Sequence, residues 1–455
     1  MRRHFVIILF FAALVGCKES VDPVIPESVK PKKELEISSN IAIRWADLAI
    51  NTLKESPDNS PTYASRSLGY IGLTMYESVA KGSIIYQSVT EGLNDLGKTP
   101  TPDSTEVLDW EVALNAGQYE IIRLLYPHAL FDVSYQWKTL YEEVLANKMA
   151  DSVAQESIDT SDLYGKLIAR QIFEWSKLDK GFEGYKNTFD RAYNYPRGFG
   201  FWSPPSFGQS SIAAPMHPFW GGNRTFVKTN SERGIPKFVL YNTDTSGTYF
   251  KEMKQVYDIN KNLSQEQKET ALWWGDDPSV SASPPGHSYY LAKLLVEEKQ
   301  TNLFEAASVF AKVGMSVADA FINVWKCKYT YHSERPTIFI NRNIDNNYSQ
   351  FWPEPPFPGF TSGHSTQAAA AATAMISVFG DDNTITDNFH TGRPTDAIRK
   401  VDYKPRTFDT IWATAEECGW SRILGGIHMS QDNIIGLDEG KHIGENINML
   451  PWKVP

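Results

Sequence analysis

Apolar residues recur every three or four positions along most of this chain, and this spacing limits the folds open to it more than any other feature. Loops rich in proline, serine and aspartate separate the periodic stretches. The sequence contains no run of short alternating strands and no strand–helix–strand rhythm. We therefore predict an all-α helical bundle, with one helix starting at Ser264 and others over residues 41–53, 64–80, 106–126, 136–155, 163–177, 248–259, 288–298, 302–329, 365–379, 406–422 and 429–447.

The length of 455 residues exceeds what one simple core accommodates, so we predict two packed helical halves. The N-terminal half is assigned to residues 36–185 and the C-terminal half to residues 247–455. The connector over residues 186–246 is rich in proline, glycine and aromatic side chains. A connector this aromatic is expected to be ordered and to cover the core, and it could also shape an access channel.

The first residues have the parts of a bacterial export signal. Arg2 and Arg3 precede an apolar segment, residues 6–15, and the sequence Leu-Val-Gly-Cys then ends at Cys17. This ending resembles a lipobox, so residues 1–17 are predicted to be a lipoprotein signal peptide and residues 18–35 a flexible tether. We expect the protein to be exported and anchored by lipid at Cys17 to the bacterial envelope, facing the periplasm or the outer membrane. The alternative is an ordinary secretory signal with a chance cysteine, and we expect no other membrane-spanning run.

The composition narrows the partners of the chain. Its formal net charge of -10 argues against nucleic acid as a partner, although local cations can still bind a small anion. The 13 Trp, 21 Tyr and 24 Phe supply a large aromatic core. Export makes a disulfide between Cys327 and Cys418 chemically possible, but two buried free thiols are the preferred interpretation. A monomer is expected.

Three separated segments carry groups suited to a compact oxyanion, and the first contains Lys328 and Arg335. Pro336 disfavours helix at Arg335, which places Arg335 just past the helix predicted to end near Lys328. A lysine and an arginine at this place carry little meaning alone, because the helix dipole favours cations near a helix C-terminus.

The second segment is Ser362-Gly363-His364, which leads directly into the alanine-rich helix over residues 365–379. A helix N-terminus offers free backbone N–H groups, and Gly363 lets the backbone approach an anion closely. Ser362 adds a hydroxyl donor, and His364 lies where a general acid or base would act. An N-cap serine with an incidental histidine is the alternative.

The third segment contains Arg422, His428 and Asp432. Gly425 and Gly426 break any helix between Arg422 and His428, so the two side chains can converge from different elements. Asp432 lies four residues after His428 and can accept from one imidazole nitrogen, leaving the other as a ligand or nucleophile. A core histidine satisfied by its neighbours is the alternative.

In this order the three segments resemble the signature of the type 2 phosphatidic acid phosphatase and vanadium haloperoxidase superfamily. The sequence departs from the usual pattern at Thr361, where a proline commonly precedes Ser-Gly-His, and this affects only backbone stiffness. The resemblance implies the helical bundle of these proteins and vanadate as cofactor. The implied ligands of its equatorial oxygens are Lys328, Arg335, Ser362, Gly363 and Arg422.

The resemblance also implies the chemistry. His428 would be the axial vanadium ligand, and His364 would accept a proton from hydrogen peroxide. Lys328 would polarise the peroxide, and a halide would be oxidised to hypohalous acid.

The shared motif does not separate peroxidases from phosphatases, in which the residue at His428 attacks phosphorus. The length of the chain and two aromatic residues favour the peroxidase. Trp325 and Phe357 match positions that line the vanadate pocket of haloperoxidases, although either could be a plain core aromatic. Phe357 resembles chloroperoxidases and bacterial iodoperoxidases. Iodide is favoured as substrate, with bromide as the other candidate, because iodide is the easiest halide to oxidise and the exported lipoprotein context resembles the bacterial iodide enzymes. An exported acid phosphatase and a non-catalytic oxyanion-binding lipoprotein are the alternatives, and two intact imidazoles argue against the second.

Several other histidines, an aspartate tract and a glycine stripe are not assigned to the oxyanion site. Gly286-His287 imitates Ser-Gly-His but lacks its companion motifs, so it is interpreted as an N-cap region before the helix over residues 288–298. His332 and His442 are expected at the surface or in supporting positions. Asp276-Asp277-Pro278 resembles an accessory segment of bacterial haloperoxidase-like proteins. Glycines at every fourth position from 436 to 444 are expected to let a neighbouring helix approach.

Overall fold

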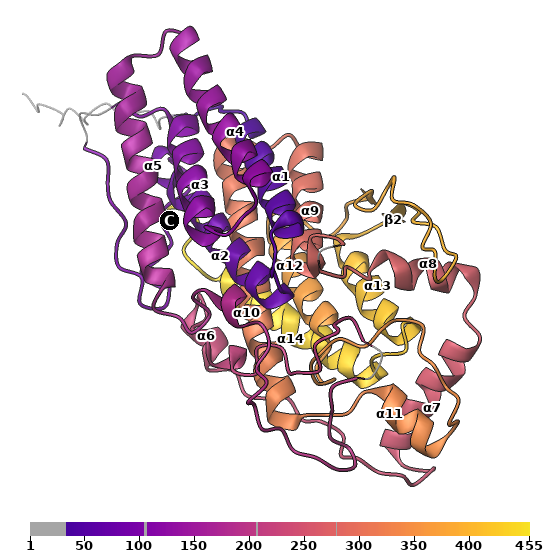
Figure 1. Ribbon diagram of the computed structural model, residues 1–455. Helices are drawn as coiled ribbons and strands as arrows, with labels where there is room; N and C mark the ends of the chain where they lie inside the picture. The colour runs from indigo at the N-terminus through magenta and orange to yellow at the C-terminus, as the bar shows by residue number, and fades with distance from the viewer. Residues whose placement is uncertain (1–32, 104–106, 206–207, 279) are drawn as a thin grey trace, which may run out of the picture. The chain divides into compact units, whose positions relative to one another are not determined.

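Amphipathic helices satisfy their own backbone hydrogen bonds and bury their apolar faces by packing on one another. The computed structural model describes residues 33–103, 107–205, 208–278 and 280–455, and the predicted all-α fold is confirmed there (Figure 1). The signal peptide, Cys17 and most of the tether lie outside the described residues. The helices are α1 (Asn40–Glu55), α2 (Pro61–Glu77), α3 (Trp110–Leu125), α4 (Phe131–Ala150), α5 (Gln155–Ser176), α6 (Lys228–Ser231), α7 (Thr248–Lys261), α8 (Gln265–Trp273), α9 (Ser283–Glu298), α10 (Leu303–Tyr331), α11 (Pro336–Asn343), α12 (Gly363–Phe379), α13 (Ile411–Leu424) and α14 (Ser430–Asn448).

Three local predictions are wrong. The helix expected over residues 406–422 begins only at Ile411, because Arg406–Phe408 forms strand β2, antiparallel to β1 (Ile385–Asp387). The helix expected over residues 136–155 ends at Ala150 in α4, and the next helix, α5, begins only at Gln155. Helix α9 begins at Ser283, so Gly286-His287 lies inside the helix rather than at its N-cap. Helix α11, which starts at a proline, was not expected.

Helix α10 is the element around which the bundle is built. It packs against α2 and α12, and its side chains are buried on nearly all sides from Leu303 to Lys328. Contrary to the sequence expectation, it is long and apolar enough to cross a membrane by length and composition, but its most apolar stretch is entirely buried inside the bundle. Since α2 and α10 come from the two predicted halves, the halves share one core, and residues 34–455 form one unit. Their division into two halves stays a prediction.

The glycine stripe on α14 faces α12 and sets how closely these helices approach. A Cβ atom on Gly440 would lie 2.1 Å from the carbonyl oxygen of Thr366, and one on Gly444 would lie 2.8 Å from that of Ala370. Both distances are shorter than a carbon–oxygen contact allows. The expected close approach is confirmed, and it matters because both helices carry candidate site residues at their N-terminal ends.

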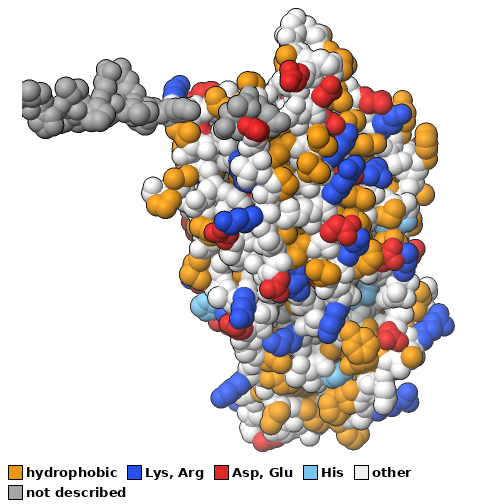
Figure 2. Space-filling view, turned by 90° about the vertical axis from the view of Figure 1, so that its left-hand side faces the viewer, with side chains coloured by type: hydrophobic (Ala, Val, Ile, Leu, Met, Phe, Trp, Pro, Cys, Tyr) orange, Lys and Arg blue, Asp and Glu red, His pale blue; other side chains and the backbone are white. Residues whose placement is uncertain are grey.

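The connector between the predicted halves covers part of the core. Trp202, Trp220 and Phe226 are buried, whereas Phe199 and Phe219 are exposed. On the face of the molecule in Figure 2, basic and acidic side chains are interspersed with apolar ones. The cations of the candidate site are instead buried.

Replacing Gly440 with alanine should destabilise the protein. Alanine is the better helix former by about 1 kcal/mol, but the added methyl group meets the Thr366 carbonyl, and overpacking of this kind costs about 1–3 kcal/mol. Chemical denaturation of Gly440→Ala measures the net effect. Gly97→Ala, where nothing lies within 4 Å of the added carbon, is the matched control. Equal stability of the two variants would show that α12 and α14 are farther apart.

Asp319 of α10 should make stability fall as the pH rises. The buried carboxylate accepts from the backbone N–H of Phe226 at 2.7 Å and from Asn230 Nδ2 at 2.9 Å, with Arg224 also nearby. Burial nevertheless raises its pKa from 3.8 to about 7. The folded state therefore binds a proton that the unfolded state releases, so stability is lost between pH 4 and pH 7, by at most about 1.4 kcal/mol per pH unit.

Urea denaturation of Asp319→Asn across this pH range should show a flatter profile than the wild type. The exposed carboxylate of Asp258 provides the control variant, Asp258→Asn. A wild-type profile that stays parallel to that of Asp319→Asn would contradict the expectation.

Candidate oxyanion site

A small cavity of about 40 Å³ is lined by residues of five helices, α2, α9, α10, α12 and α13, and of four loop segments. A cavity of this size holds a small ion or a few waters. Several residues predicted from sequence line it together: Trp325, Phe357, Gly363, His364, Arg422 and His428. Lys328, Arg335, Ser362 and Asp432 are buried close behind this lining.

The N-terminus of α12 forms one wall. Ser362 is the N-cap, and its hydroxyl accepts from the backbone N–H of Ser365 at 3.3 Å, as a capping serine should. Gly363 is the first helical residue, so the amides of the open first turn stand at the cavity. The backbone N–H of Ser362 also donates to the carbonyl of Asp432 at 3.1 Å, which ties α12 to α14.

Lys328 and Arg335 are held by backbone carbonyls. The Lys328 ammonium donates to the carbonyls of Pro358, Gly359 and Thr361 at 2.9, 2.6 and 2.6 Å. The Arg335 guanidinium donates to the carbonyls of Ile427 and Phe357 at 2.9 and 3.0 Å. Both side chains are completely buried from solvent. The irregular segment over residues 357–361 thus supplies most of the acceptors that compensate their charge.

His428 is oriented from both sides. Its Nδ1 lies 2.8 Å from Asp432 Oδ2, and its Nε2 lies 3.0 Å from an Arg335 nitrogen. The Arg335 guanidinium can only donate, so Nε2 carries the lone pair and Nδ1 carries the hydrogen that faces Asp432. The predicted pairing of His428 with Asp432 is therefore present. A ligand at Nε2 would replace the contact with Arg335.

Arg422 and His364 share one backbone anchor. Arg422 donates to the carbonyl of Trp274 at 2.9 Å, and the His364 ring also forms a hydrogen bond with the backbone of Trp274. The Nε of Arg422 and the Nε2 of His364 are buried without a protein partner. Buried polar atoms normally have a hydrogen-bond partner, so these two atoms indicate that a polar ligand binds in the cavity.

The electrostatics of the cluster favour an anion. Burial and the adjacent Arg335 hold the pKa of the Lys328 ammonium well below its usual value, and burial lowers the pKa of Arg335 to about 10. Burial also lowers the pKa of Arg422. Burial and the surrounding cations hold the pKa of both His364 and His428 well below 6.5. Like charges crowded in a dry site repel one another, and a bound anion would relieve that repulsion.

The opposite wall is aromatic. The rings of Trp325 and Phe357 lie 4.9 Å apart, and the Lys328 ammonium lies 5.2 Å from the Phe357 ring. Gln209 of the connector and Pro278 line both this cavity and a wider one of about 810 Å³. The connector therefore contributes to the lining of both cavities, and its role in an access channel stays a prediction.

Comparisons with known proteins found one family model and several solved structures that resemble this chain. Residues 308–450 match the family model described as the VCPO second helical-bundle domain. A crystal structure described as the first bacterial vanadium-dependent iodoperoxidase matches with a TM-score of 0.79 and 24% identity, covering 93% of this chain and 98% of that one. The chain has the vanadium haloperoxidase fold.

A second neighbour of the same fold is a holo-type bacterial vanadium-dependent chloroperoxidase. Its TM-score is 0.68 at 16% identity, and the match covers 92% of this chain and 98% of that one. The apo-type structure of such a chloroperoxidase matches with a TM-score of 0.66 at 15% identity, over 91% of this chain and 98% of that one. Among curated protein sequences, none matches.

Around the candidate oxyanion site the structure also shows what the sequence did not. His287 is buried between Asp276 and Asp387, and His390 joins the same cluster. The only hint was the tract Asp276-Asp277-Pro278, since a partner for its carboxylates cannot be read from local spacing. The other expectations hold: His332 bonds Tyr193 near the surface, His442 is exposed, and Cys327 and Cys418 are buried free thiols.

Inorganic phosphate should stabilise the protein through this site. At 100 times its dissociation constant a ligand of the folded state adds about 2.7 kcal/mol to the free energy of unfolding. Arg422→Ala should lose most of this gain, because the variant lacks a donor that faces the cavity. Thermal unfolding with and without phosphate measures it, each variant against its own baseline. Arg44→Ala, which removes an exposed pair with Glu143, is the control. The same phosphate effect in both variants would place the anion elsewhere.

Proposed function

We propose that this protein is a vanadate-dependent haloperoxidase, which uses hydrogen peroxide to oxidise a halide to hypohalous acid. The observation that carries the proposal is the convergence of three buried cations, a helix N-terminus and two oriented imidazoles on one small cavity. These groups come from positions 328 to 428 of the chain, and the positive charges of Arg335, Lys328 and Arg422 all act on His428. A tetrahedral oxyanion matches them in charge and size.

The residues present fit vanadate. The unpartnered Nε of Arg422 and Nε2 of His364 offer polar contacts to a buried guest. His428 presents the lone pair of Nε2, because Asp432 fixes the hydrogen on Nδ1. His428 would bind the vanadium through Nε2, and Lys328, Arg335, Ser362, Gly363 and Arg422 would donate hydrogen bonds to the vanadate oxygens.

The bound cofactor would supply a Lewis acid that activates hydrogen peroxide without changing its own oxidation state. Side chains of the protein transfer the proton, stabilise the charge and exclude water. His364 accepts a proton from the peroxide at Nε2, since its bond to the Trp274 backbone engages the other ring nitrogen. Lys328 draws negative charge toward its ammonium, which three carbonyls hold in place. Trp325 and Phe357 keep water away from the reacting atoms.

We further propose iodide as the preferred halide, with bromide as the second substrate. Iodide is the easiest of the halides to oxidise and the least strongly hydrated, so it suits the aromatic wall of this cavity. The neighbour with a TM-score of 0.79 is itself described as an iodoperoxidase, whereas the neighbours at 0.68 and 0.66 are described as chloroperoxidases.

The export signal supports a second, independent proposal. Residues 1–17 have the form of a lipoprotein signal, so we propose that Cys17 anchors the mature protein to the bacterial envelope and that it acts there as a monomer. Substitution of Cys17 with serine should release the protein from the membrane fraction.

The activity test begins with purified protein to which orthovanadate is added. Formation of triiodide from iodide and hydrogen peroxide should require vanadate and should be lost in His428→Ala. The exposed His442 provides the control variant His442→Ala, which should keep full activity. Hydrolysis of phosphate esters by vanadate-free protein, without halide oxidation, would instead identify a phosphatase with His428 as nucleophile.

A matched variant separates the two imidazoles. His364→Ala should still bind vanadate, while turnover falls by about 10²–10⁴, as expected for the loss of a general base. Loss of vanadate binding in this variant would contradict the division of roles between His364 and His428.

A further inference from the structure

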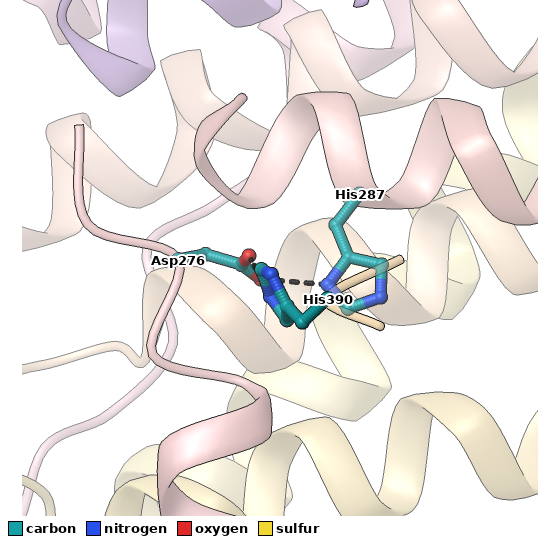
Figure 3. Close-up of side chains that lie close together, drawn as sticks. All are labelled: Asp276, His287 and His390. Carbon is teal, nitrogen blue, oxygen red and sulfur yellow. Dashed lines mark hydrogen bonds and ion pairs between the residues drawn. The ribbon is translucent and has the colours of Figure 1, made fainter. Parts of the chain in front are cut away.

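A second buried cluster lies directly behind the cavity. His287 of α9 points toward Asp276, with His390 beside them (Figure 3). His287 Nδ1 lies 2.8 Å from Asp276 Oδ2, and His390 Nε2 lies 3.0 Å from Asp276 Oδ1. All three side chains are almost completely buried. Neither the motifs nor the chemistry proposed above uses them.

The cluster has the composition of a metal site, but its hydrogen bonds argue against one. The ligand atoms of Asp276, His287 and His390 lie within 4.8 Å of one another. An Arg393 nitrogen lies 3.1 Å from Nδ1 of His390. A guanidinium can only donate, so Nδ1 carries the lone pair and Nε2 carries the hydrogen. Nε2 therefore donates to Asp276 and has no lone pair for a metal.

The same reasoning fixes the charge of His287. Its Nε2 lies 2.7 Å from Asp387 Oδ2, so each ring nitrogen faces a carboxylate and both must donate. Burial alone would lower its pKa, but Asp276 and Asp387 raise the pKa of His287 to about 10. The result is an imidazolium clamped between two carboxylates, and Asp387 is held in addition by Trp273 Nε1 at 2.6 Å.

This clamp acts on the segment that lines the cavity. Asp276 has a φ of 48°, a left-handed conformation that is uncommon for residues other than glycine. The bonds from His287 and His390 hold it there. Two residues earlier stands the Trp274 carbonyl, to which Arg422 donates at 2.9 Å and with which His364 also bonds. The Trp274 ring stacks on His287 with centroids 4.6 Å apart.

We propose that His287 is a positioning residue of the oxyanion site: clamped between Asp276 and Asp387, it holds the Trp274 carbonyl where Arg422 and His364 are both oriented toward the bound anion. His390 and Arg393 complete the clamp from the other side. The proposal rests on the proposed function only for its kinetic readout. Its binding readout concerns any tetrahedral oxyanion.

His287→Gln should weaken the binding of inorganic phosphate and of orthovanadate by roughly 10–100-fold, the usual effect of removing a residue that orients a ligand. Titration calorimetry below the unfolding temperature of the variant measures the affinity. Arg393→Ala, at a partly exposed position, should weaken binding in the same direction by about 2–5-fold, and it keeps the test open if His287→Gln does not fold. Glu77→Gln is the control, because Glu77 is a buried carboxylate bonded to Val89 and Ser88, outside the site.

Two further readouts exclude a merely structural role. Histidine-selective ¹⁵N spectra at pH 8 should show one imidazole with hydrogens on both nitrogens, absent in His287→Gln. At saturating orthovanadate kcat for iodide should still be lower in His287→Gln than in the wild type, because His364 is misaligned. Unchanged oxyanion affinity in both variants, or kcat fully restored at saturation, would overturn the proposal.

A metal ion bound by Asp276, His287 and His390 is the alternative to the proposed clamp, and it predicts a different result. A stoichiometric divalent metal in the purified protein, lost in His390→Gln, would overturn the proposal in favour of a metal site. If the wild type binds phosphate and vanadate but oxidises no halide, the proposed function fails while the affinity measurements still decide the role of His287.

Discussion

The burial of three cations beside one another is the constraint on which the rest of the structure depends. Moving each charge out of water costs several kcal/mol, and the cations of Lys328, Arg335 and Arg422 also repel one another. The carboxylate of Asp432 is engaged by His428, and that of Asp276 by His287 and His390. Backbone carbonyls therefore provide the compensation, from residues 357–361, Ile427 and Trp274. Carbonyls can point at a side chain only where the backbone leaves helical geometry, so irregular segments lie inside this helical bundle.

The helices give these irregular segments a fixed frame. Helix α10 carries Trp325 and Lys328 one turn apart on a rod that is buried along almost its whole length. Helices α12 and α14 approach so closely that glycine is needed at the contact, and the bond from Ser362 to the Asp432 carbonyl links their N-terminal ends. The N-terminus of α12 and His428 are thereby held at a fixed distance from each other. A site that must enclose a small anion without water needs this rigidity, since a shift of about 1 Å would open it.

Much of this arrangement can be predicted from the sequence, for reasons that particular residues show. Helical periodicity predicts the all-α fold, because burying one face per helix is a local pattern. The Ser-Gly-His tract predicts an anion-binding helix start, since N-caps and first-turn amides follow from local geometry. The spacing of His428 and Asp432 predicts their bond, because residues four apart on a helix face are neighbours.

Contacts between distant segments could not be predicted in this way. Nothing in the sequence around Lys328 indicates that its ammonium would be bonded to carbonyls 30 residues later. His287 resembled an incidental N-cap histidine, because Asp387, its partner, lies 100 residues away. The start of α13 was misjudged because Ile385 and Phe408 pair across a small sheet, a non-local contact that overrides the helical pattern of residues 406–410.

The space around the anion bears on the proposed choice between peroxidase and phosphatase more than the hydrogen-bond donors do. Phosphate and vanadate are both tetrahedral and would accept the same hydrogen bonds from Arg422, Arg335 and the start of α12. These donors alone therefore favour neither reaction. A phosphate ester also brings an organic group, and a cavity of about 40 Å³ has no room for one. That group would have to extend past Gln209 and Pro278 into the cavity of about 810 Å³. Hydrogen peroxide and a halide are far smaller than an ester, and the aromatic wall of Trp325 and Phe357 offers an ester oxygen no donor. The geometry therefore favours small substrates.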